Sequence, residues 1–256
     1  MVTKLLKASY AAAMYFFLYV PLLVTIVFSF NDAGTAEHWS GFTTKWYVAL
    51  FQDQSLIKAA LRSLLLAAMA ATTSTVVGTI IAIALHRYRF IGQRVVFGSL
   101  SVIMMSPEII QGISLVMVFV ILGVPLGFVT VLLSHTVFCF PFVTMTVLAR
   151  LKGFNRNLVE AAADLGATDV SIVQKILIPL ILPAVFAGWL MSFTLSIDDV
   201  IISFFVSGKN YEILPLKIYS MVRTGIQPDV NALCAAMFFA TFAVVLISYR
   251  LVRIRK

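Results

Sequence analysis

Three acidic side chains stand out in this sequence because they lie in long apolar stretches: Glu108, Asp198 and Asp199. An ionised carboxylate at the centre of a membrane-spanning helix costs about 2.5–3.5 kcal/mol on insertion scales, so buried acids usually face a cavity or a positive partner. The middle of these apolar stretches contains no Lys or Arg, and Arg62, near the end of one of them, could neutralise at most one acid. The three acids are therefore expected to attract a cation from outside the chain.

The surroundings of the acids indicate which cation they would suit. One polar stripe at helical spacing carries Ser192, Ser196, Asp199 and Ser203. Carboxylates in apolar, hydroxyl-bearing surroundings suit an elongated organic cation, whose amines meet the acids while its methylenes lie on Met104 or Met105. An ion pair with a second subunit is the alternative explanation of the acids. The predicted residues of a cargo pathway are Glu108, Asp198, Asp199 and Ser196.

The sequence carries no motif for ATP hydrolysis or metal catalysis. The segment Gly208-Lys209-Asn210 lacks both the preceding glycine and the hydroxyl of a phosphate-binding loop. Cys139 and Cys234 each lie in an apolar run, without disulfide or metal-ligand spacing. His135 is expected to make a packed contact between helices. We therefore predict no enzyme, no catalytic residue, no metal and no cofactor of the chain's own, so that a partner must supply the energy for any work.

A polar island, Glu160 to Pro179, interrupts the apolar stretches in the second half of the chain. Apolar side chains at i, i+3, i+4 and i+7 predict a short helix that ends at Gly166, where a residue without Cβ permits a sharp turn. Thr168 or Asp169 is placed to cap a second helix, whose stripe is Val170, Val173 and Ile176/Leu177 and which Pro179 is expected to end. This hairpin of two helices has the shape of a plug for a soluble partner.

The spacing of the island is specific: Glu-Ala-Ala, three residues, Gly, nine residues, Ile-x-x-Pro. It resembles the EAA motif of ABC-importer permeases, a loop that docks into a groove of the cytoplasmic ATPase. An interfacial hairpin without a partner is the alternative. The resemblance implies an ATPase-coupling loop at about 149–183. The coupling residues that it implies are Glu160, Ala161, Ala162, Asp164, Gly166, Ile176 and Pro179.

Composition places the chain in a membrane. Its 256 residues are 61% hydrophobic and 12% charged, whereas soluble domains are about 45–50% apolar and about 25% charged. Six stretches are long enough to cross a bilayer, which takes about 20 apolar residues per helix. The net charge of +8 is spread over short loops, without the basic face that nucleic acid requires. The six predicted spans are roughly 10–30, 62–85, 96–121, 127–148, 184–206 and 232–250.

The basic residues predict the orientation of the spans. Of the 19 Lys and Arg, 13 fall on the side that holds both termini and the 160–179 island. By the positive-inside rule that side is cytoplasmic. Pro107 is expected to kink the third span, since it frees a backbone carbonyl. No repeat or linker is visible, so the expected organisation is a single domain, 1–256.

A second resemblance covers nearly the whole chain. Segments such as Phe28-Ser-Phe-Asn31, Gly41-Phe-Thr-Thr-Lys-Trp-Tyr47 and Met104-Met-Ser-Pro-Glu108 resemble those of the C permease subunits of bacterial spermidine/putrescine importers. The resemblance implies an all-α, six-helix permease of type I ABC-importer architecture in the bacterial inner membrane. It also implies as partners a homologous second permease, two ATPase subunits that bind ATP and Mg²⁺, and a periplasmic polyamine-binding protein, which the 41–47 segment lies near.

Two other functions remain open from the sequence. A stand-alone secondary carrier would show inverted repeats and charged relay pairs, neither of which is found, and it would leave the cytoplasmic island without a purpose. An importer of the same class could instead carry another cargo, although the acids disfavour anions. The preferred polyamine does not follow from the permease, because recognition outside the cell belongs to the binding protein.

Overall fold

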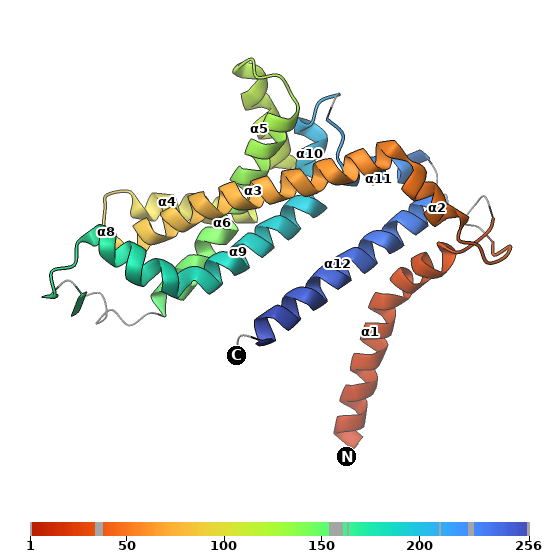
Figure 1. The fold of residues 1–256 in the computed structure, drawn as a ribbon, viewed down its shortest axis with the longest axis horizontal. Helices are drawn as coiled ribbons and strands as arrows, with labels where there is room; N and C mark the ends of the chain where they lie inside the picture. The colour runs from red at the N-terminus through yellow and green to blue at the C-terminus, as the bar shows by residue number, and fades with distance from the viewer. Residues whose placement is uncertain are drawn as a thin grey trace. The chain divides into compact units, whose positions relative to one another are not determined.

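The computed structural model describes residues 2–33, 38–153, 161–162, 164–209, 211–224 and 228–254. Apart from one isolated bridge between Asn31 and Phe42, these residues form helices, turns and loops (Figure 1). The chain divides into two compact units, which are described separately: Met1–Lys58 with Lys217–Lys256, and Ala59–Leu216. The all-α fold class is confirmed, while the single-domain organisation stays a prediction.

The first unit is built on two long helices, α1 (Val2–Phe28) and α12 (Pro228–Ile254). A short helix, α2 (Lys45–Gln52), follows the loop after α1, and α12 packs against both α1 and α2. A further helix, α11 (Leu214–Thr224), precedes α12 in the chain. Side chains along α1 are largely exposed in the isolated chain, as an apolar helix that faces lipid or another subunit would be.

The second unit is organised around α6 (Phe128–Lys152), which packs along α9 (Ile178–Asp198). Two glycines let neighbouring backbones approach α6 closely. A Cβ on Gly78 of α3 (Gln54–Arg87) would lie 2.8 Å from the Phe140 carbonyl oxygen, and one on Gly188 of α9 would lie 3.0 Å from Val143. Small residues at helix crossings are typical of membrane bundles, where association depends on close packing.

Four helical stretches in the described part of the chain are long and apolar enough to cross a membrane. They are Ser9–Phe28, Gln54–Arg87, Phe128–Lys152 and Val170–Asp198, and a bent pair of helices makes a fifth if counted as one span. The sixth predicted span, 232–250, falls within α12, where the described residues include an apolar helical stretch, Asp229–Phe239. The count of six spans stays a prediction.

Two predicted spans are interrupted, which the sequence interpretation did not foresee. The predicted third span, 96–121, is two helices, α4 (Gln93–Met105) and α5 (Glu108–Ile121), bent by 112°. The distortion expected at Pro107 is present, but it is a break between two helices and not a kink within one. The predicted fifth span, 184–206, ends as α9 at Asp198 and resumes as α10 (Ile201–Val206). Both interruptions leave backbone groups that side chains must satisfy, because lipid offers no hydrogen bonds.

Candidate functional site

The helix end at Gly166 has the geometry predicted from the sequence. Gly166 adopts φ +80°, and the Ala167 N–H donates to the Ala162 carbonyl at 3.0 Å, the six-to-one bond that closes a helix through a left-handed glycine. Thr168 caps the following helix, since its Oγ1 accepts from the Ser171 N–H at 3.3 Å. Ala161 and Asp164 are also helical, whereas Glu160 lies outside the described residues.

The second helix of the island does not end at Pro179, which corrects the prediction. It begins as α8 (Asp169–Ile172), passes through a π-helical turn, η1 (Val173–Leu177), and continues as α9 through Pro179. A proline ring would clash with the carbonyl four residues earlier in a regular α-helix. The wider π turn directly before Pro179 relieves that clash, so the helix runs on.

The π turn also changes which side chains are buried. Ile172 and Leu177 are five residues apart and both buried, because hydrogen bonds from i to i+5 bring such positions onto one face. Val170, which the α-helical period placed on the stripe, is instead 63% exposed, and Leu165 beside the glycine turn is 89% exposed. Two large apolar side chains therefore flank the turn without cover from the described residues.

The interruption between α4 and α5 is stabilised by a glutamine that sequence reasoning missed. The Gln111 Nε2 donates to the carbonyls of Ile103, at 2.8 Å, and Ser106, at 3.0 Å. Pro107 has no N–H to donate to the Ile103 carbonyl, which otherwise accepts only a longer bond, 3.4 Å, from the Ser106 N–H. Glu108 is in the first turn of α5, where the helix dipole favours a negative charge, and it is exposed. Gln111 lies three positions after Glu108 in an apolar stretch, and this spacing is the sequence signal that could have identified it.

The interruption between α9 and α10 is stabilised by a buried network around Asp199. One carboxylate oxygen, Oδ1, accepts from the Ile202 N–H at 3.2 Å, and the other, Oδ2, accepts from the N–H and the hydroxyl of Ser203, both at 2.8 Å. His135 of α6 lies 3.2 Å from Oδ2 through its Nε2. Asp199 thus caps α10 and joins it to α6.

His135 is held on both sides. Its Nδ1 lies 2.7 Å from the Ser196 hydroxyl and its Nε2 lies 2.8 Å from the Ser203 hydroxyl. Because Ser203 gives its hydrogen to Asp199, it accepts from His135, so Nε2 carries a proton. The expected helix contact of His135 is present, but it is a polar junction of α6, α9 and α10 rather than simple packing.

Asp199 is therefore not an unpaired acid, contrary to the sequence prediction. Its partner is neither Lys nor Arg but a histidine 64 positions earlier in the chain, together with backbone N–H groups. Arg62, the one cation considered, lies over the Tyr211 ring with 5.5 Å between its Cζ and the ring centroid. No ion pair joins Arg62 to an acid among the residues that the structure describes.

The remaining predicted acids are in a different environment. Asp198 and Glu108 are both exposed, and both Asp198 and Asp199 are near enough to Glu108 to interact with it electrostatically. The structure therefore brings the three acids into one region, with two of them exposed and the third buried. Ser196 is buried and faces His135 rather than open space.

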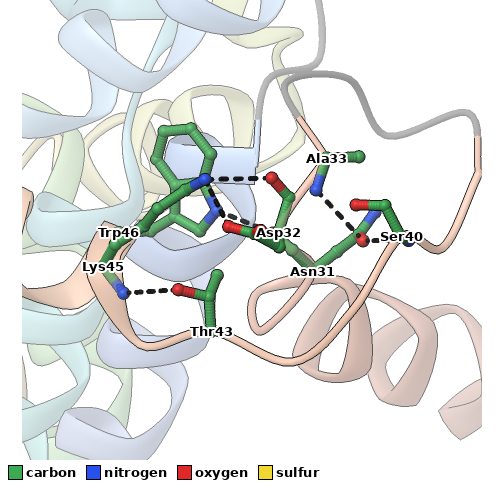
Figure 2. A network of polar contacts seen from close by, with 7 residues as sticks. All are labelled: Asn31, Asp32, Ala33, Ser40, Thr43, Lys45 and Trp46. Carbon is green, nitrogen blue, oxygen red and sulfur yellow. Dashed lines mark hydrogen bonds and ion pairs between the residues drawn. The ribbon is translucent and has the colours of Figure 1, made fainter.

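The loop after α1 forms a compact polar network, shown in Figure 2. Asn31 is buried: its Oδ1 accepts from the Ser40 N–H at 2.9 Å, and its carbonyl accepts from the Trp46 Nε1–H at 2.7 Å. Lys45 forms an ion pair with the Asp32 carboxylate. Trp46 therefore has a specific partner within the loop, and the loop presents Phe42 at 73% exposure.

The described residues present two exposed carboxylates and an exposed apolar turn. No group of three or more potential metal ligands occurs among the described residues. Buried polar contacts fix the interrupted helices, while Glu108 and Asp198 remain accessible. Two accessible carboxylates in an apolar protein attract a cation.

Comparison with known protein families gives one match that covers most of the chain. Residues 74–255 match the family described as "Binding-protein-dependent transport system inner membrane component". The matched region includes the glycine turn at Gly166 and both interrupted spans.

Among curated proteins, the chain is similar to polyamine permeases over almost its full length. It is 49% identical over 253 residues to the spermidine/putrescine transport system permease protein PotC of Escherichia coli, covering 99% of this chain and 96% of that protein. The PotC of Haemophilus influenzae is 47% identical, with 97% and 96% covered. The putrescine transport system permease protein PotI of Escherichia coli is 38% identical, with 92% and 86% covered.

Solved structures with the same fold are more distant in sequence. A bacterial ABC transporter involved in the import of the acidic polysaccharide alginate matches with a TM-score of 0.76 at 16% identity, covering 98% of this chain and 95% of that chain. The MetNI methionine ABC transporter in an inward-facing form matches with a TM-score of 0.67 at 20% identity, covering 78% and 96%. At these identities the likeness concerns the fold.

Proposed function

Because the chain belongs to the family of binding-protein-dependent transport system inner membrane components, we propose that it is the permease subunit of an ATP-driven importer of polyamines. The resemblance found from the motif and the whole-chain segments is confirmed by the family match and by the 49% identity to a spermidine/putrescine permease. The architecture of an ABC-importer permease is likewise confirmed by the structural neighbours.

The cargo follows from one observation above all: the identity to polyamine permeases extends over 99% of the chain. Charge supports the same cargo. Spermidine and putrescine are elongated organic cations, and Glu108 and Asp198 are exposed carboxylates in an apolar protein. Their attraction for an amine is strengthened where water is excluded, because the effective dielectric constant falls.

The four predicted pathway residues divide into two roles. Glu108 and Asp198 are the groups that meet the cargo, since they are exposed and near each other. Asp199 and Ser196 act through His135: they are buried and fix the end of α9 and the start of α10. The buried pair positions the exposed acids, because Asp198 is the residue directly before the cap.

Coupling to the ATPase is assigned to the helix, glycine turn and helix around Gly166. Leu165 and Val170 are large, apolar and exposed at the turn, which suits a surface that a soluble partner covers. Ala161, Ala162, Asp164, Ile176 and Pro179 belong to the same segment, and Glu160 directly precedes it in the sequence. In this function both termini are cytoplasmic, and a second permease, two ATPases that bind ATP with Mg²⁺, and a periplasmic binding protein complete the transporter.

The cargo is tested by uptake of radiolabelled spermidine and putrescine into cells that express the chain with its transporter partners. Cells that lack only this chain should lose uptake of at least one polyamine, and re-expression should restore it. Methionine uptake, measured in parallel, should not change. Polyamine uptake that survives the deletion in full, with no other polyamine system present, would show that the cargo is different.

The coupling surface is tested by a matched pair of glycine substitutions. Gly166 and Gly123 both have positive φ, +80° and +66°, and a Cβ at either position meets no atom within 4 Å. Val at either position therefore strains the backbone without a clash. Gly166→Val should abolish co-purification of the ATPase, whereas Gly123→Val, in the loop between α5 and α6, should retain it. Equal retention by both variants would refute the coupling assignment.

A further inference from the structure

A pocket of about 440 Å³ opens where α3 ends, α4 begins and α6 ends, within the second unit. Its basic side chains come from three separate segments: Arg89 follows α3, Arg94 is in the first turn of α4, and Lys152 is the last residue of α6. Tyr88 and Phe97 are among its aromatic lining. The lining residues run from Leu85 to Lys152, so the fold brings together segments that are distant in the sequence.

Among the residues that the structure describes, the basic side chains of this pocket have no acidic partners. No carboxylate lines it, and in the described ranges Arg89, Arg94 and Lys152 form no ion pair with Asp or Glu. The Lys152 Nζ lies 5.7 Å from the centroid of the Phe97 ring, which holds it at the pocket. Three concentrated positive charges, without a counter-charge from the described part of the chain, favour an anion.

The start of α4 adds to this preference. The helix begins after Gly92, which has φ +100° and no side chain that could cap the first N–H groups. The positive end of the α4 dipole is therefore directed toward the same place as Arg94. Gln93 is not available as a substitute cap, because its Nε2 donates to the Leu85 carbonyl at 2.7 Å.

The position of the pocket indicates the source of the anion. Both α3 and α6 are long and apolar enough to cross a membrane, and both have their C-terminal ends at the pocket. The pocket is therefore at the boundary where two spans leave the hydrocarbon, the level of lipid headgroups. Beside it, Ile91 is fully exposed and Tyr88 is 51% exposed, so apolar surface continues from the basic pocket.

We propose that this pocket binds the phosphate of an anionic phospholipid from the leaflet at which α3 and α6 end. The guanidinium groups of Arg89 and Arg94 hold the phosphate oxygens, Lys152 adds charge, and the exposed apolar side chains lie along the acyl chains. Scattered basic residues would orient the spans equally well without forming a pocket. Their convergence from three segments is what a bound headgroup explains.

The test compares lipid binding to the full-length chain, purified in a mild detergent, by native mass spectrometry. Phosphatidylglycerol and phosphatidylethanolamine are offered at equal concentration. The wild type should prefer phosphatidylglycerol. Arg89→Gln with Arg94→Gln should weaken its binding by about thirtyfold, since each basic side chain near an anionic surface contributes about fivefold. Phosphatidylethanolamine binding should change little.

A charge-matched control separates the pocket from the general charge of the surface. Arg150 and Arg250 are exposed arginines outside the pocket, so Arg150→Gln with Arg250→Gln removes the same charge. This control should bind phosphatidylglycerol within about twofold of wild type, because it leaves the pocket intact. An equal loss in both pairs, or a wild type without preference, would overturn the proposal.

Two further arms address folding and the source of the phosphate. Arg89→Lys with Arg94→Lys keeps the charges but not the guanidinium forks, so it should keep a preference for phosphatidylglycerol, reduced by about threefold to fivefold. Complete loss of the preference in this pair, at an unchanged melting temperature, would contradict the assignment. Inorganic phosphate at millimolar concentration should not displace the lipid. Full displacement would identify a soluble phosphate as the ligand and refute lipid binding.

Discussion

Each of the two interrupted spans leaves backbone groups that need hydrogen-bond partners, and each has an acid at the break. One of these acids is exposed and the other is buried. Between α4 and α5, the freed carbonyls are bound by Gln111, and the acid, Glu108, is left exposed at the start of α5. Between α9 and α10, Asp199 itself binds the freed N–H groups and is buried against His135. An intramembrane acid is therefore no uniform sign of a cargo contact, because its role depends on which other side chain satisfies the break.

The largest effect should come from removing the buried acid. Asp199→Leu leaves the Ile202 and Ser203 N–H groups and His135 without their acceptor, and breaking a buried pair in this way costs about 3–5 kcal/mol. We expect the purified protein to melt far lower and to accumulate poorly in the membrane. Asp198→Leu is the control, since its exposed side chain should leave the melting temperature nearly unchanged. Equal melting temperatures of the two variants would contradict the structural role of Asp199 and the exposed position of Asp198.

A smaller loss of stability is expected from adding a methyl group where α5 contacts α10, the two helices that follow the interruptions. Gly112 of α5 faces α10, and a Cβ there would lie 2.7 Å from the Phe205 ring. Gly112→Ala should destabilise the protein by about 1–3 kcal/mol through overpacking. Gly98→Ala is the control, because its Cβ would meet no atom within 4 Å and alanine favours a helix. Thermal unfolding in detergent measures both, and a Gly112→Ala protein as stable as wild type would contradict the close approach of α5 and α10.

The smallest effect on stability should come from the exposed acid of α5. Glu108→Gln removes a charge from the first turn of a helix, which costs about 0.3–1 kcal/mol. Uptake of spermidine should nevertheless fall severalfold at normal abundance, because the cargo loses one attractive group. Spermidine should suffer more than the shorter putrescine, which has fewer amines to place. Wild-type uptake of both would show that Glu108 does not meet the cargo.

Local signals in the sequence predicted the helices, the turn at Gly166 and the cap at Thr168. These features depend on neighbours within a few residues, such as a glycine without Cβ or a hydroxyl three residues before an N–H. The family resemblance was equally visible, since it depends on short motifs and their spacing. The π turn was missed, because a regular period of 3.6 residues places Val170 on the buried stripe and a proline is expected to end a regular helix at Pro179.

The buried network escaped prediction because it depends on residues distant in the sequence. His135 is separated by 61 positions from Ser196 and by 68 from Ser203, and no periodicity connects them. The polar stripe from Ser192 to Ser203 was recognised, but it was interpreted as facing cargo. A search that treated histidine as a partner for intramembrane acids would have found the junction, since each of these groups needs a hydrogen bond in an apolar protein.

The unbroken helix from Asp169 to Asp198 has a mechanical consequence. Its 30 residues make a rod about 45 Å long, with the glycine turn at one end and the cap of α10 at the other. A rod of that length tilted by about 5° about one end moves its other end by about 4 Å. In the proposed coupling, a movement of the segment beside Gly166 is therefore transmitted along this helix to Asp199, and the π turn, which lies near Gly166, is the part of the helix with irregular hydrogen bonding.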